Sequence, residues 1–137
     1  MNWETLDEEN YTLIKKNRNK SDKRETVIYR WIVKDNNNKI IGGYIGQTTN
    51  FGLRIYDYTR EYKPKYKKIY ITDYKVAGKI KNAKDDNNKT VILERLKIQD
   101  ADIKKMSDKK YRLELERKEI INFIRLKDKP EIWNSLS

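Results

Sequence analysis

Cysteine and histidine are both absent from this 137-residue chain. Without cysteine there is no disulfide and no thiolate metal site. Without histidine, a general base has to be a tyrosine, a lysine, a carboxylate or a metal-bound hydroxide. A bound metal has to rest on oxygen ligands, which favours Mg²⁺ or Mn²⁺ over Zn²⁺.

Long apolar runs are also missing, and the first residues, Met1 to Glu4, are polar and acidic rather than signal-like. We therefore expect a cytoplasmic protein with no membrane partner. The length predicts a single domain that buries about two-thirds of the surface of its unfolded chain.

Acidic residues are too few to balance the basic ones, since 32 Lys and Arg face 21 Asp and Glu, for a net charge of +11. From Arg54 to Lys84, ten basic residues face three acidic ones, and six tyrosines are interleaved among them. Such a stretch favours binding to a nucleic-acid backbone. A solvated basic face from a lysine-rich proteome is the alternative. The candidate backbone contacts are Lys63, Lys65, Lys67 and Lys68.

β-Branched and aromatic residues predict two strands around the turn at Asp35–Asn38, and a third strand later in the chain. Capping residues and spacing predict three helices. The expected strands are 25–34, 39–47 and 90–98, and the expected helices are about 50–60, 73–81 and 108–126. This order predicts an α+β domain with a small antiparallel three-stranded sheet flanked by helices. Residues 1–24 are expected to form an N-terminal extension, and residues 25–137 the domain, with a basic insert at about 61–84.

The second predicted strand carries three glycines, Gly42, Gly43 and Gly46, in five positions. Glycine normally weakens a strand, so this density predicts a bulge or a close approach to the backbone. A functional reason, that something must come close to this backbone, is compatible with that structural interpretation.

Two tripeptides on the predicted hairpin, Val27-Ile28-Tyr29 and Tyr44-Ile45-Gly46, place two tyrosines on adjacent strands. Arg54 follows Tyr44 by ten residues, and Tyr58 lies one helical turn after Arg54. An arginine fork beside phenolic hydroxyls suits a phosphate group. Ordinary cross-strand packing of the two tyrosines is the alternative.

These residues and their spacing resemble the GIY-YIG nuclease family, most closely its minimal single-domain members, the phage endonuclease II type and the small restriction endonucleases. Val27 stands where the family has its first glycine. The resemblance covers about residues 25–134 and implies the GIY-YIG fold. It also implies a metal-dependent DNA endonuclease of a bacterial or phage-infected cell. The site residues that it implies are Tyr29, Tyr44, Arg54, Tyr58, Lys75 and Glu119, with Pro130 and Asn134 after them.

The resemblance also implies roles. Glu119 would hold Mg²⁺ or Mn²⁺, with Glu116 as the open alternative, and Arg54 would stabilise the transition state. Tyr29, assisted by Lys75, would activate or orient water, whereas Tyr44 and Tyr58 would orient the phosphate and the water. A double-strand cut would then require a homodimer, a higher oligomer or two successive nicks. The rivals are a catalytically silent nucleic-acid-binding module on the same fold and a basic protein that stacks single-stranded RNA on its tyrosines.

Overall fold

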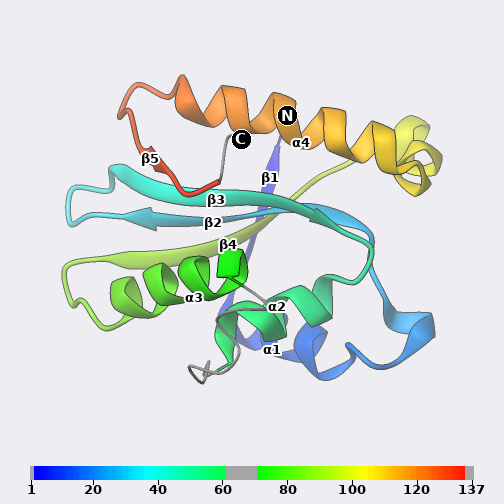
Figure 1. Ribbon diagram of the computed structural model, residues 1–137, viewed down its shortest axis with the longest axis horizontal. Coiled ribbons are helices and arrows are strands. Elements are labelled where there is room, and N and C mark those ends of the chain that lie inside the picture. Colours follow the sequence, from blue (N-terminus) through cyan, green and yellow to red (C-terminus); the bar gives the residue numbers. More distant parts are fainter. Residues whose placement is uncertain (1, 61–70, 135–137) are drawn as a thin grey trace.

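A mixed five-stranded sheet with the order β1-β4-β2-β3-β5 runs through the protein (Figure 1). The computed structural model describes residues 2–60 and 71–134. The strands are β1 (Trp3–Leu6), β2 (Val27–Lys34), β3 (Ile40–Thr48), β4 (Thr90–Leu96) and β5 (Glu131–Ile132). The α-helices are α1 (Glu8–Lys16), α2 (Phe51–Thr59), α3 (Ile71–Lys84) and α4 (Lys109–Ile124), with 3₁₀ turns η1 (Ser21–Lys23) and η3 (Asp100–Ser107).

The predicted α+β class is confirmed, and the three predicted strands are the central strands β2, β3 and β4. Both β3 and β4 pair antiparallel with β2. The predicted number of strands was too small, because β1 adds to β4 and β5 adds to β3. A strand of two residues, such as β5, carries too little periodicity to be recognised in a sequence.

Helices cover both faces of the sheet, α1, α2 and α3 one face and α4 the other (Figure 1). Successive side chains of a strand point to opposite faces. Tyr29 and Trp31 of β2 accordingly pack in the core under α1, α2 and α3, whereas Ile28 and Ile32 pack with α4. Strand β2 is therefore buried on both sides.

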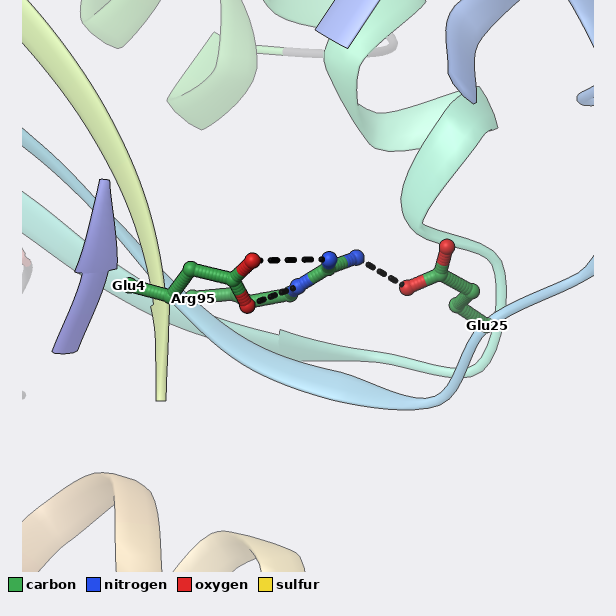
Figure 2. A network of polar contacts seen from close by, with 3 residues as sticks. All are labelled: Glu4, Glu25 and Arg95. Carbon is green, nitrogen blue, oxygen red and sulfur yellow. Dashed lines mark hydrogen bonds and ion pairs between the residues drawn. The ribbon is translucent and has the colours of Figure 1, made fainter. Parts of the chain in front are cut away.

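The first 24 residues are tied into this domain. Leu6 of β1 and Tyr11 of α1 are buried. Arg95 of β4 donates to Glu4 of β1 at 3.0 Å and to Glu25, just before β2, at 2.6 Å (Figure 2). The hydrogen bond and the charge of Arg95 hold the pKa of Glu4 below its ordinary value. The segment expected as an extension thus supplies an edge strand, a packed helix and part of an ion-pair network.

The hairpin between β2 and β3 turns at Asp35, whose side chain accepts hydrogen bonds from the backbone N–H groups of Asn37 and Lys39. Asn38 there has a φ of 63°, a left-handed conformation that asparagine tolerates. The register of the hairpin shifts between Val33 and Lys34, next to this turn. The predicted turn is confirmed.

No helix in the described part of the chain combines the length and apolar character that a membrane crossing requires. Of the basic insert expected at about 61–84, residues 71–84 form α3, and residues 61–70 lie outside the described residues.

Candidate active site

Three tyrosines expected in the site form one cluster on the face under α2. The ring centroids of Tyr29, Tyr44 and Tyr58 lie 5.8–6.4 Å apart. The hydroxyls of Tyr29 and Tyr58 share a hydrogen bond of 2.8 Å. Tyr29 is 1% exposed and Tyr58 2% exposed, whereas Tyr44 is half-buried. Tyr44 is therefore the member of the cluster that meets solvent.

A glycine on β3 makes room for Tyr29. In the β2–β3 register Tyr29 lies opposite Gly46, and Tyr44 lies opposite Trp31, so the two tyrosines are diagonal rather than direct neighbours. A Cβ atom on Gly46 would overlap the ring and hydroxyl of Tyr29. The close approach predicted from the glycines is real here, and the approaching group is the protein's own tyrosine.

Helix α2 brings Arg54 to the same region. The side chain of Asn50 caps the helix by accepting from the N–H of Leu53 at 3.2 Å, which places Arg54 in the first turn. Phe51 seats the helix by stacking on Tyr29, with centroids 5.7 Å apart. The Arg54 side chain is 37% exposed and lies 3.6 Å from the carboxylate of Asp57. The arginine thus stands at the surface, one turn before the buried Tyr58.

Asn134 is seated against the neighbouring strand edge. Its side-chain oxygen accepts from the N–H of Ile45 at 3.0 Å, and its side-chain nitrogen donates to the carbonyl of Ile45 at 2.5 Å. Trp133 extends the pairing of β5 by donating its N–H to Gly43 at 2.8 Å. The side-chain amide of Asn134 therefore pairs with the backbone of Ile45 as a neighbouring strand would, next to Tyr44 on β3.

Glu119 lies on α4 and is 5% exposed, and its carboxylate accepts a hydrogen bond from Asn122 at 3.3 Å. Helix α4 covers the face of the sheet opposite to the tyrosines (Figure 1). Glu119 and Tyr44 accordingly occupy opposite sides of β3. The structure therefore does not bring Glu119 into the tyrosine cluster.

Glu116, the alternative to Glu119, lies one helical turn earlier on α4 and is half-buried. Burial raises the pKa of its carboxyl above the ordinary value of 4.5. Among residues 2–60 and 71–134, no three carboxylates gather closely enough to enclose a metal. One or two carboxylates fit Mg²⁺, which keeps several waters and takes further ligands from substrate phosphates.

The remaining predicted residues are not among those that form the cluster, or they lie outside the described chain. Lys75 is an exposed residue near the start of α3. Pro130 precedes β5, consistent with its expected place before Asn134. Lys63, Lys65, Lys67 and Lys68 lie outside the described residues.

Arg112 was not among the predicted site residues. It is a buried charged residue, with 5% exposure. It donates from Nε to the side-chain oxygen of Gln47 on β3 at 2.9 Å, and from Nη1 to the carbonyl of Met106 at 2.7 Å. These bonds fix α4 on β3 just beyond Gly46. A usable signal was present in the sequence, because Arg112 lies seven residues before Glu119 and shares its helix face.

Comparisons with protein-family models, curated proteins and solved structures find no match for this chain.

Proposed function

We propose that this protein is a metal-dependent endonuclease that hydrolyses phosphodiester bonds of double-stranded DNA. The observation that carries the proposal is the cluster of Tyr29, Tyr44 and Tyr58, with Arg54 one turn before Tyr58 on the same helix. These are the residue types and spacings of the GIY-YIG resemblance, and they come together in space from three separate elements.

The fold supports the same proposal. Under this proposal, the antiparallel strands β3-β2-β4 with helices on both faces would be the GIY-YIG core of the five-stranded sheet. In this interpretation β1 and β5 are additions at the two edges. Strand β5 carries the chain to Asn134, the residue that the resemblance places last.

Arg54 has the chemistry for the negative charge of the reaction. Hydrolysis adds a water oxygen to phosphorus and breaks the bond to the leaving oxygen, while charge grows on the non-bridging oxygens. A guanidinium supplies a planar pair of donors to such oxygens, and it is most effective when it is held in place beforehand. Arg54 is partly exposed, and Phe51 packs its helix against Tyr29, so a phosphate can reach the Arg54 guanidinium.

The tyrosines divide into a buried pair and an accessible member. Tyr44 is half-buried and is the hydroxyl that we assign to orienting the phosphate or the attacking water. Tyr29 and Tyr58 hold one another through the 2.8 Å hydrogen bond. Their role is to fix the surface beneath Tyr44 and to polarise its surroundings. Lys75, exposed on α3, keeps in this proposal the role that the resemblance gives it, a positive charge that assists the tyrosines.

Glu119 is the residue that would hold the metal, with Glu116 as the alternative on the same helix face. A bound Mg²⁺ or Mn²⁺ would withdraw charge from a non-bridging phosphate oxygen. Glu119 would supply a carboxylate oxygen to such an ion. Arg112 positions it by clamping α4 to Gln47.

The test is cleavage of supercoiled plasmid in Mg²⁺ and in EDTA by the wild type, Arg54→Ala and Glu119→Ala. Loss of one charge-stabilising group typically lowers the rate about 10²–10³-fold. Arg117→Ala, an exposed arginine on α4, is the matched control and should cut normally. Full activity of Glu119→Ala would show that Glu119 does not hold the metal. Full activity of Arg54→Ala would contradict the proposed mechanism.

A second candidate is a DNA-binding module without catalysis. It is favoured by the near-complete burial of Tyr29 and Tyr58, which is what a structural aromatic core would show. The plasmid assay separates the two, because the module binds DNA with no Mg²⁺-dependent cleavage. If cleavage occurs, linear product formed without a nicked intermediate would indicate a dimer, and a nicked intermediate would indicate successive cuts.

A further inference from the structure

A strongly basic segment lies next to the candidate site but contributes none of its residues. Residues 15–24, named here the N-terminal basic loop, contain six Lys or Arg and one acid, Asp22. They comprise the last two residues of α1, the turn η1 and the chain between and after them. This surplus is denser than that of the chain as a whole.

The outer cations of the loop point into solvent. Those that are exposed are Lys16, Lys20, Lys23 and Arg24. Within the described residues none of them belongs to an ion pair. Their charge is therefore not neutralised by that part of the protein.

The loop is nevertheless held in a fixed position against α2. The side chain of Asn50 donates to the carbonyl of Arg18 at 3.0 Å. A Cβ atom on Gly52 would lie 2.5 Å from the carbonyl of Ile14, which shows how closely the backbones approach. The guanidinium of Arg18 stacks 4.0 Å from the ring centre of Tyr56. The surface is thus preorganised, which lowers the entropy lost on binding.

The far end of the loop is also anchored. Glu25 accepts the N–H of Phe51 through its backbone carbonyl at 3.1 Å. Its carboxylate accepts from Arg95, which also binds Glu4 (Figure 2). The loop is therefore held at both ends, by α1 at its start and by Glu25 and its ion pair with Arg95 of β4 at its end. Helix α2 contacts it in between.

The loop and Arg54 flank the same end of α2. Asn50 and Arg54 are four residues apart, which is about 6 Å along a helix, and a helix with its side chains is about 10–12 Å wide. One turn of duplex DNA is about 34 Å long. A single duplex can therefore reach Arg54 and the anchored loop together.

We propose that the N-terminal basic loop binds the sugar-phosphate backbone of duplex DNA and holds the duplex across α2. This inference rests on the proposed function for its partner. Exposed, unneutralised cations match closely spaced phosphates. The loop contains no aromatic residue, so it offers no platform on which single-stranded bases would stack.

The test measures binding of a fluorescent duplex at several salt concentrations in EDTA, so that cleavage plays no part. The loop variant replaces Lys16, Lys20, Lys23 and Arg24 by Gln. The control variant replaces Lys104, Lys109, Lys110 and Lys118, four exposed lysines of η3 and α4, by Gln and so carries the same net charge. Thermal melts establish that both variants are folded.

We expect the loop variant to bind at least tenfold more weakly and the control less than threefold. The slope of log K against log salt should fall by about 0.9 for each phosphate that the loop variant no longer neutralises. Equal weakening of duplex binding in both variants, or an unchanged salt slope, would overturn the proposal. It would also be overturned if the wild type bound single-stranded RNA more tightly than the duplex and the loop variant lost that RNA binding. If only the loop variant binds the duplex more weakly and the wild type does not cut plasmid, the loop is a DNA-binding surface but the protein is not a nuclease.

Discussion

The two faces of the sheet are built from different kinds of side chain. Under α1, α2 and α3 the core combines six aliphatic residues with five aromatic ones, Tyr11, Tyr29, Trp31, Phe51 and Tyr58. Under α4 it is mainly aliphatic, and its members are Ile28, Ile32, Ile45, Leu96, Met106, Leu115, Ile120 and Phe123.

The two cores place different demands on their side chains. An aliphatic core is stabilised by burial alone, whereas a buried tyrosine also needs a partner for its hydroxyl. Phenylalanine would fill nearly the same space as Tyr29 or Tyr58 without that requirement. The paired hydroxyls satisfy that requirement for one another, and their place beside Tyr44 is what the proposed function uses.

The largest expected effect comes from breaking the aliphatic face. Phe123 is 1% exposed and packs against Gly43 of β3. Phe123→Ala should lower the free energy of unfolding by about 3–5 kcal/mol, because it leaves a cavity under α4. Denaturant titration measures this decrease. A change below about 1 kcal/mol would mean that α4 does not depend on the packing of Phe123.

The next effect breaks the aromatic face through a glycine. Gly46→Ala forces a methyl group into the position of the Tyr29 ring, and overpacking of this kind costs about 1–3 kcal/mol. Gly78→Ala on α3 is the control, because nothing lies within 4 Å of its Cβ position. It should stabilise the protein by up to about 1 kcal/mol, since alanine favours a helix. Equal effects of the two substitutions would contradict the packing of Tyr29 on Gly46.

The sequence predicted the hairpin because it follows local rules, and it predicted the residues of the tyrosine cluster through the family resemblance. Strand composition, the Asp35 turn and the Asn50 cap act within a few residues. The resemblance supplied the members of the tyrosine cluster through the short spacing of Tyr44 on β3 from Arg54 and Tyr58 on α2. The pairing of β1 with β4 joins residues about 90 positions apart, and no local pattern specifies it. Asn134 is a similar case. The resemblance pointed to it by its place after Pro130, but no local pattern predicts its hydrogen bonds to Ile45.

The Tyr29–Tyr58 hydrogen bond has a smaller expected effect on stability. Replacing either tyrosine by phenylalanine removes one partner of a buried bond, which is worth about 1 kcal/mol. A double-mutant cycle of Tyr29→Phe and Tyr58→Phe should give a coupling free energy of that size. Additive effects would show that the two hydroxyls do not stabilise one another. Under the proposed function, the cleavage rate should fall by more than the fraction unfolded explains.

The smallest effect concerns Glu116, the one half-buried carboxylate on the α4 face whose pKa burial raises. The folded state disfavours its charge, so its contribution destabilises the protein at neutral pH. That destabilisation is relieved as the pH falls from the raised pKa towards 4.5. Glu116→Gln should therefore have a higher Tm than the wild type at pH 7, with the difference shrinking in acid.

Glu4→Gln is the matched control, because Arg95 lowers the pKa of Glu4. Its stabilising contribution is present above 4.5 and is lost as the pH falls through the lowered pKa, so the variant should melt lower than the wild type at pH 7. If Glu116→Gln also melts lower at pH 7, the carboxylate has a cationic partner in the folded protein. Assignment of the metal needs the second result, loss of cleavage by Glu116→Gln while Glu119→Ala retains it. The metal would then belong to Glu116, one turn nearer to Arg112 and Gln47.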